Sequence, residues 1–284
     1  MRFAFKTSPQ NTAWRDLLAV WQAADNIDIF ESGWTFDHFY PIFSDPTGPC
    51  LEGWTTLTAL AQATKRLRVG VLVTGIHYRH PAVLANMAAA LDIISDGRLE
   101  LGIGAGWNEE ESGAYGIELG SIKERFDRFE EACEVLISLL TKESTTFDGK
   151  YYQLKDARNE PKGPQQPHPP ICIGGSGEKR TLPLTARYAD HWNFAGGTPE
   201  EFARKRDVLA ARCADIGRDP KEITLSSHVR LEPDLDYGKV IDEAAGLGNE
   251  GLDLAIVYLP PPHTPAVLEP LAEAIRDSGL LTRN

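Results

Sequence analysis

The strongest constraint on the fold is a regular alternation of strand and helix patterns along the 284 residues. Short β-branched runs such as 67–73 are typical of buried parallel strands. Each is followed by a segment with apolar residues at the three- and four-residue spacing of a helix. Because repeated strand–helix units require right-handed crossovers, the pattern predicts a parallel sheet covered by helices. Eight such units along the chain favour a closed (β/α)8 TIM barrel over an open doubly wound sheet.

Local signals set the boundaries that we expect for these elements. Pro81 is a favoured first-turn residue, and Ser121 with Glu124 has the spacing of a capping box. Pro183 is expected to kink or split the helix that begins near 176. The expected strands are 2–6, 29–36, 67–73, 98–103, 171–173, 191–194, 223–231 and 252–258. The expected helices are 11–24, 51–64, 81–94, 121–140, one from 176, 199–216, 237–247 and 265–276.

The length suits a single barrel domain with one insertion. A (β/α)8 barrel takes roughly 250 residues, so residues 1–284 are expected to form one domain. The extra residues fall at 141–170, after the fourth helix. Within them, 147–152 contains an Asp-Gly pair typical of a hairpin turn, and 160–170 is a proline-rich stretch typical of a surface loop.

An excess of acidic residues narrows the range of partners. The chain carries 41 Asp and Glu against 29 Lys and Arg, a net charge of −12, which repels nucleic-acid phosphates. No apolar run approaches the roughly 18 residues of a membrane span, and the start of the chain lacks the apolar core of a secretion signal. Four cysteines without a CxxC pattern favour a reducing compartment. We therefore expect a cytoplasmic protein that acts on a small molecule, without nucleic-acid or membrane partners.

Signals for metal, P-loop and hydrolase chemistry are weak or absent. His77 and His80 form an HxxH pattern, but no acidic or cysteine partner stands at ligand spacing, so no metal site is expected. The sequence contains neither the GxxxxGK[ST] of a P-loop nor the GxSxG of a hydrolase nucleophile. A metal-dependent hydrolase is therefore the least favoured of the enzyme classes considered.

Two glycine-rich segments follow expected strands and indicate ligand binding at one rim. Residues 174–177 follow strand 171–173 and open a helix, whose free amides suit a phosphate. Lys179 and Arg180 are expected in the first turn of that helix, where cations are unfavourable unless they neutralise an anion. Residues 102–106 have GxGxG spacing with Trp107 next, which departs from a dinucleotide fingerprint and instead lets a flat ligand approach the backbone. Either segment can also be an ordinary flexible turn.

An acid and a histidine, Asp37 and His38, leave the second strand together. The carboxyl ends of barrel strands carry catalytic residues, and an imidazole beside a carboxylate can act as a general acid or base. A histidine that merely caps a loop is the structural alternative. The two glycine segments belong to the same rim, and they favour the catalytic role.

Taken together, these segments resemble the bacterial luciferase-like superfamily, in its branch of oxidoreductases that depend on coenzyme F420. The resemblance covers nearly the whole chain and is most specific at 72–81, 94–107 and 173–190. It implies a barrel with a deazaflavin ring at the C-terminal rim and a non-prolyl cis peptide near Leu72 and Val73. It also implies His38 as the residue that exchanges a proton near the reactive carbon. The expected cofactor contacts are Asp37, Leu72, Val73, Thr74, Gly104, Ala105, Gly106, Asn108, Gly174, Gly175, Ser176, Gly177, Lys179 and Arg180.

One departure from the family pattern bears on the substrate. Family members that oxidise a sugar phosphate carry a glutamate after the glycine loop as a proton donor, and this chain has Trp107 there. A sugar-phosphate dehydrogenase is therefore disfavoured. The candidate substrate-pocket residues, each of which can also be ordinary rim packing, are Phe39, Tyr40, Trp107, His228, Arg230 and Tyr258.

The resemblance implies a hydride transfer between deazaflavin C5 and a small organic substrate, in a direction that the sequence leaves open. One alternative is a monooxygenase of the same superfamily that uses reduced FMN and dioxygen, since the glycine loop suits either cofactor. Another is a flavin-binding barrel without catalysis. The resemblance also implies a homodimer.

Overall fold

The strands close into an eight-stranded parallel barrel, as the alternation predicts. The computed structural model describes residues 1–282. The barrel strands are β1 (Arg2–Lys6), β2 (Phe30–Thr35), β3 (Arg68–Val71) with its continuation β4 (Thr74–Gly75), β5 (Leu99–Gly104), β8 (Ile171–Gly174), β9 (His191–Phe194), β10 (Thr224–Arg230) and β11 (Leu254–Tyr258). Their order is β3-β2-β1-β11-β10-β9-β8-β5, and β3 also pairs with β5, which closes the ring.

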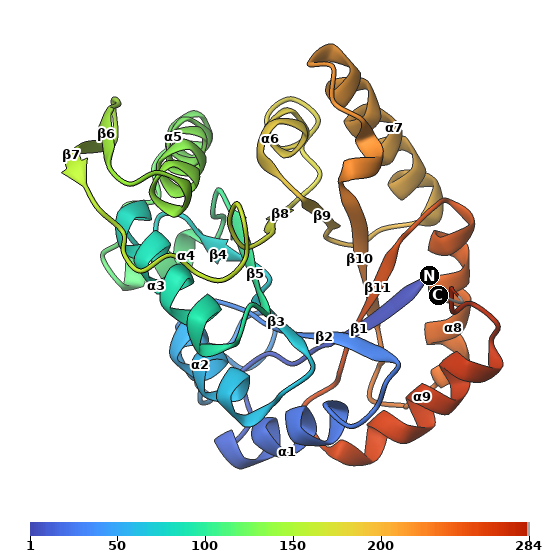
Figure 1. Cartoon of the computed structure of the whole chain (residues 1–284). Coiled ribbons are helices and arrows are strands. Elements are labelled where there is room, and N and C mark those ends of the chain that lie inside the picture. The colour runs from blue at the N-terminus through green and yellow to red at the C-terminus, as the bar shows by residue number, and fades with distance from the viewer. Residues whose placement is uncertain (283–284) are drawn as a thin grey trace.

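Helices surround the strands and follow them in turn (Figure 1). They are α1 (Trp14–Ala24), α2 (Gly53–Ala63), α3 (Pro81–Ile94), α5 (Ile122–Thr141), α6 (Thr181–Tyr188), α7 (Pro199–Asp215), α8 (Tyr237–Asn249) and α9 (Leu268–Asp277), with 3-10 turns η1 (Pro220–Glu222) and η2 (Pro265–Val267). The start of the chain lies beside the segment that follows α9 (Figure 1), where the N-terminal amine of Met1 donates to Leu280 O at 2.8 Å.

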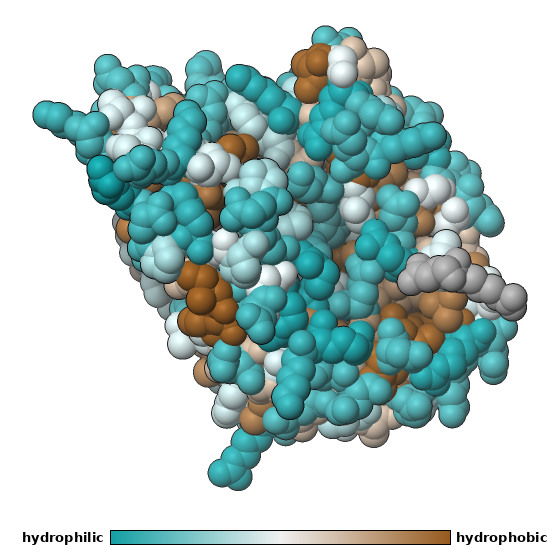
Figure 2. All heavy atoms as spheres, in the orientation of Figure 1, coloured by the Kyte–Doolittle hydropathy of each residue, from teal (hydrophilic) through white to brown (hydrophobic). Residues whose placement is uncertain are grey.

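Two apolar layers hold the barrel together. One fills the space between strands and helices and includes Phe3, Phe5 and Trp21, and the rings of Phe5 and Trp21 meet edge to face. The other lies inside the barrel, where Trp34 and Cys172 are fully buried with Leu254 and Ile256. Each such aliphatic or aromatic side chain stabilises the fold by roughly 1.5–3 kcal/mol relative to exposure. On the face seen in Figure 2, hydrophilic side chains dominate and apolar ones gather in small patches.

The insertion forms the predicted hairpin. Strands β6 (Thr145–Asp148) and β7 (Gln153–Ala157) pair antiparallel, and in Figure 1 they stand out beside α5. Glu131 on α5 accepts from the backbone N–H groups of Lys150, Tyr151 and Tyr152 at 2.8–3.1 Å, which fastens the turn to the barrel. No helix within residues 1–282 has the length and apolar character to cross a membrane.

Some boundaries confirm the local signals and others correct them. The capping box of Ser121 and Glu124 is present, and α3 begins at Pro81. The helix predicted from 176 begins at Thr181 instead. This start places Pro183 in the first turn, where its missing N–H has no intrahelical partner to lose, so the expected kink is wrong. A short helix, α4 (Glu109–Ala114), lies in a segment that the sequence did not predict to be helical.

Candidate active site

A cavity of about 580 Å³ opens among the carboxyl ends of the barrel strands. This is the rim at which (β/α)8 barrels place catalytic residues. The predicted site residues that line it are His38, Leu72, Val73, Gly106, Trp107, Gly174, Gly175, His228, Arg230 and Tyr258. The predicted site residues outside its lining are Asp37, Phe39, Tyr40, Thr74, Gly104, Ala105, Asn108, Ser176, Gly177, Lys179 and Arg180.

The floor of the cavity is the bulge between β3 and β4. The peptide bond between Leu72 and Val73 is cis, which confirms the bond expected there from the resemblance. The Val73 side chain stands between two glycines. A Cβ atom on Gly104 would come within 2.9 Å of it, and one on Gly174 within 3.1 Å. Glycine at these positions therefore makes room for Val73 beneath the cavity.

The loop after β8 keeps two backbone amides without a partner. Gly175, at a φ of 114° that favours glycine, donates its N–H to Asn193 O at 3.1 Å. The amides of Ser176 and Gly177 have no hydrogen-bond partner among residues 1–282. Successive free amides of this kind form an anion-binding concavity, so these two remain the predicted phosphate contacts.

The two cations after this loop are placed differently from the prediction. Because α6 begins at Thr181, Lys179 and Arg180 precede the helix instead of occupying its first turn. Arg180 pairs with Asp127 at 2.7 Å, whereas Lys179 is exposed. Arg180 is therefore already neutralised, and a contact of either cation with a phosphate stays a prediction.

His38 faces the cavity with one ring nitrogen fixed from behind. Its Nδ1 lies 2.7 Å from Oε2 of Glu111, a fully buried residue of α4. Its Nε2 has no hydrogen-bond partner in the described part of the chain. Glu111 also accepts from the Phe39 N–H at 2.6 Å and from the Tyr78 hydroxyl. The acid behind His38 is thus held by three donors.

The charge of Glu111 determines which nitrogen of His38 carries the proton. Burial raises the pKa of Glu111, but the hydrogen bonds from His38, Tyr78 and Phe39 outweigh burial and lower it below its ordinary value. An ionised carboxylate can only accept hydrogen bonds, so His38 donates through Nδ1. The lone pair on Nε2 then faces the cavity, where it can take a proton from a ligand hydroxyl.

Asp37 lies behind His38 and does not line the cavity. Its buried carboxylate accepts two hydrogen bonds from the Arg79 guanidinium, one of them 3.0 Å long. Arg79 also donates to Glu52, the N-cap residue of α2. Burial raises the pKa of Asp37 and the Arg79 guanidinium opposes it, with burial the larger effect. In this arrangement Asp37 anchors the turn that presents His38.

Aromatic side chains form the mouth of the cavity. The rings of Phe43 and Trp107 stack at 5.5 Å between centroids, although 86% and 51% of these residues is exposed. Phe39 and Tyr40 pack instead toward Tyr115, outside the cavity lining. The stacked pair is therefore the aromatic surface that an entering ligand meets.

Sequence reasoning missed several residues that line the cavity or lie directly behind it. Lys6, His77 and Tyr78 line the cavity, and Glu111 lies behind it. Glu111 follows Asn108 at the spacing of a capping-box pattern, and its N–H does donate to Asn108 Oδ1 at 3.1 Å. That spacing could have indicated a helix here. Burial lowers the pKa of His77 to about 4, and its buried Nδ1 has no partner among residues 1–282.

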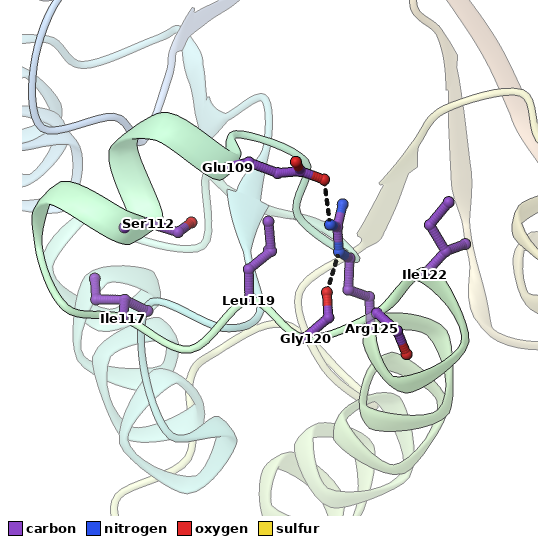
Figure 3. A pocket seen from close by; sticks show the side chains of 9 residues that line it. Glu109, Ser112, Ile117, Leu119, Gly120, Ile122 and Arg125 are labelled. Carbon is purple, nitrogen blue, oxygen red and sulfur yellow. Dashed lines mark hydrogen bonds and ion pairs between the residues drawn. The ribbon is translucent and has the colours of Figure 1, made fainter.

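A second cavity, of about 550 Å³, lies between α4 and the start of α5 (Figure 3). Its two charged lining residues pair with each other: Arg125 bonds Glu109 at 2.7 Å and donates to Gly120 O at 2.9 Å. This cavity therefore offers a ligand no unpaired charge from its lining. Across residues 1–282, no group of three or more His, Cys, Asp or Glu side chains is arranged to hold a metal ion.

Comparison with known proteins identifies the family. The family model described as luciferase-like monooxygenase matches residues 1–236. The chain belongs to the luciferase-like monooxygenase family. This confirms the superfamily resemblance drawn from the sequence, and the chain is an oxidoreductase of this family.

Individual relatives lie in both branches of the family. An F420-dependent glucose-6-phosphate dehydrogenase of Amycolatopsis mediterranei is 32% identical over 250 residues, covering 85% of this chain and 72% of the relative. The pyrimidine monooxygenase RutA of Methylobacterium radiotolerans is 36% identical over 174 residues, covering 59% of this chain and 44% of the relative. An F420-dependent secondary alcohol dehydrogenase, solved with an F420–acetone adduct, superposes with a TM-score of 0.87 over 98% of each chain at 20% identity, which shows a shared fold.

Proposed function

We propose that this chain is a coenzyme F420-dependent oxidoreductase that transfers a hydride between deazaflavin C5 and a small organic substrate. The observation that carries the proposal is the geometry of His38. Its Nδ1 is held by Glu111, and its Nε2 faces the cavity that the Leu72–Val73 bulge floors. The F420-dependent dehydrogenases among the relatives support this choice of cofactor.

The cavity has the features that a flat ring with an anionic side chain requires. Leu72 and Val73 supply an apolar floor. The unpartnered amides of Ser176 and Gly177 lie outside the lining, directly after the lining residue Gly175, and suit a phosphate. The orphaned Nδ1 of His77 adds a polar contact that the protein itself leaves unused. These residues fit the deazaflavin, and we assign them, with the 104–106 loop, to holding it.

When bound, F420 supplies a ring carbon that accepts or gives a hydride, and this chain supplies orientation and proton transfer. For oxidation of an alcohol, Nε2 of His38 takes the hydroxyl proton, and the ionised Glu111 stabilises the imidazolium from 2.7 Å. For reduction of a carbonyl, His38 returns that proton to the oxygen. Trp107 and Phe43 stack on each other at the mouth of the cavity.

The second candidate is an FMN-dependent monooxygenase that uses dioxygen. The 36% identity with RutA favours it, and the phosphate-binding amides suit FMN as well. A flavin-binding barrel without catalysis is the third, and it would bind a cofactor without turning over any substrate. The chain is further proposed to act as a cytoplasmic homodimer. Its four cysteines are free, as a reducing compartment favours.

Fluorescence titration of the cofactor-free protein with F420, and separately with FMN, tests the proposal. Tight binding of F420 with weak binding of FMN is the expected result. The reverse preference would establish the FMN alternative, and binding of neither would overturn the cofactor assignment.

A matched pair of variants locates the binding. Gly175→Ala places a side chain at a φ of 114° in the cavity, and we expect it to weaken cofactor binding. Gly196→Ala imposes the same kind of strain at a φ of 118°, in open space outside the cavity lining. Equal losses in the two variants would show that the effect is general destabilisation rather than a change at the site.

A further inference from the structure

Two cations line one wall of the cavity without a carboxylate partner. Lys6 on β1 and Arg230 on β10 flank Tyr258 on β11, and the three residues are in register across neighbouring strands. Lys6 is buried, with 5% of its surface exposed, and Arg230 is exposed at the rim. Neither side chain forms an ion pair with any of residues 1–282. Arg230 reaches Glu243 through its backbone N–H, at 3.4 Å.

The contacts of Lys6 leave its charge uncompensated. Its Nζ donates to Leu72 O at 3.0 Å and lies 3.5 Å from His228 Nε2. Burial and the neighbouring Arg230 lower the pKa of Lys6 to about 7. Burial, together with Lys6 and Arg230, lowers the pKa of His228 well below its ordinary value. A protein with a net charge of −12 thus keeps a buried amine, a neutral imidazole and a guanidinium together, although buried charges are normally paired.

We propose that Lys6 and Arg230 bind a carboxylate of the substrate, so that the substrates of this enzyme are small anionic alcohols or carbonyl compounds. This inference rests on the proposed function. The carboxylate accepts from the Lys6 ammonium and from the Arg230 guanidinium, which is suited to bind it through two N–H groups. Both cations lie against the Tyr258 ring, at 5.3 Å and 5.1 Å from its centroid, and the His228 ring meets Tyr258 edge to face.

The phosphate of the cofactor is assigned to a different wall. Its proposed amides follow β8. In the barrel, β9, β10 and β11 separate β8 from the strand of Lys6, and β9 separates it from the strand of Arg230. A reduced deazaflavin ring carrying a delocalised negative charge is the other oxyanion that Lys6 could meet. Separate measurements of the affinity for reduced F420 and of the affinity for a carboxylate distinguish the ring from the substrate.

Calorimetric titration of the cofactor-free protein tests the proposal with straight-chain carboxylates from acetate to hexanoate, each against its own amide. We expect at least one carboxylate to bind roughly tenfold more tightly than its amide, the effect of a charge-assisted hydrogen bond. Lys6→Met and Arg230→Leu should each remove most of this preference. Lys221→Met, which deletes one exposed cation elsewhere, should retain it. Equal binding of acid and amide in every pair would overturn the proposal.

The pH dependence and the cofactor affinity sharpen the test. Lys6 is charged below about pH 7, so the carboxylate preference should fall as the pH rises through that value. The other titratable groups facing Lys6 are His228 on β10, Tyr258 on β11 and Cys172 on β8. If Lys6→Met weakens binding of reduced F420 but leaves the carboxylate preference intact, the anion belongs to the cofactor and the proposal fails. Failure of wild-type protein to bind F420 would overturn the proposed function alone.

Arg230→Leu guards against a folding artefact. Its side chain is exposed, so this variant should unfold at the wild-type temperature even if Lys6→Met is destabilised. Loss of the carboxylate preference in a fully folded Arg230→Leu protein supports the proposal, and full retention there counts against it.

Discussion

The barrel contains two buried histidine–glutamate pairs at opposite ends of its strands. At the C-terminal rim, His38 Nδ1 lies 2.7 Å from Glu111. Near the start of the strands, His191 Nδ1 lies 3.0 Å from Glu100. In each pair the glutamate is at most 8% exposed. The same two residue types are therefore paired at both ends of the barrel, and the neighbouring residues determine the function of each pair.

The His191–Glu100 pair, near the start of the strands, is closed, because its polar atoms are all bonded within the protein. The His38–Glu111 pair, at the rim, is open, because one ring nitrogen is free within residues 1–282. His191 Nε2 bonds Ser226 Oγ at 2.6 Å, and Glu100 also accepts from Arg68 at 2.8 Å. Every polar position of that pair is used within the protein. In the rim pair, by contrast, Nε2 of His38 has no partner among the described residues and faces the cavity. A fully bonded pair fixes the packing of strands, whereas a pair with one free nitrogen can exchange a proton with a ligand.

The largest effect is expected from His38→Ala. Removing a general acid–base group should lower kcat by roughly 10²–10⁴-fold. Binding of F420 should change little, because Leu72, Val73 and the loop after β8 hold the cofactor. Steady-state kinetics and a cofactor titration on the same preparation check this. Equal losses in turnover and in cofactor affinity would show a structural histidine.

Glu100→Gln tests the closed pair. The substitution leaves the buried His191 and the partly exposed Arg68 without their anion, and breaking a buried pair costs about 3–5 kcal/mol. Urea unfolding should register this loss, while kcat per folded molecule stays near the wild-type value because the residue lies at the far end of the barrel. A large drop in kcat with unchanged stability would contradict the comparison.

The contrast between the ends also shows how far the sequence could predict this molecule. Local signals determined the architecture, because a capping box at Ser121 and a proline at 81 act within one turn of helix. The rim location of His38 followed from its place directly after the second predicted strand, whereas the bulge at Leu72–Val73 followed from the family resemblance. The exact contacts of the site did not follow, because they depend on which loops meet across the rim.

Glu111 is a residue whose role in the site could not be predicted from the sequence. It stands in a run with Glu109 and Glu110, and the sequence treats the three alike. In the structure the first two are exposed, while Glu111 is fully buried against the turn after β2. Asp37 shows the same dependence on distant partners, because it is bonded to Arg79, 42 residues away, and its contact with the cofactor ring stays a prediction. Pairings across such sequence distances arise only when the barrel closes.

Glu111→Gln should have an intermediate effect that separates positioning from catalysis. The amide can still meet the Phe39 N–H, but it carries no charge to fix the Nδ1–H tautomer of His38 or to stabilise an imidazolium. We expect kcat to fall roughly tenfold or more, less than in His38→Ala. Glu110→Gln is the matched control on the exposed face of the same helix.

The pH profile of kcat gives the decisive readout for Glu111→Gln. We expect the profile of Glu111→Gln to shift relative to the wild type, because a positive charge that forms on His38 during turnover loses its ionised partner. Glu111→Asp should restore part of the rate. An unshifted profile with reduced thermal stability would assign Glu111 a packing role alone.

The smallest expected effect is the pH dependence of stability from the closed pair. Burial raises the pKa of Glu100, but His191 and Arg68 outweigh burial and hold it below its ordinary 4.5. The stabilisation that ionised Glu100 contributes is therefore present above pH 4.5 and lost as the pH falls.

His191 acts in the opposite direction. Burial alone would lower the pKa of His191, but Cys172 and Glu100 raise it above 6.5. The stabilisation that protonated His191 contributes is therefore complete below pH 6.5 and declines as the pH rises. Between pH 6 and pH 9, wild-type protein should thus lose about 1 kcal/mol more stability than Glu100→Gln in urea unfolding. Equal losses of unfolding free energy in the two proteins would show that the charges of the His191–Glu100 pair do not contribute to stability. The closed pair would then differ from the rim pair in packing alone.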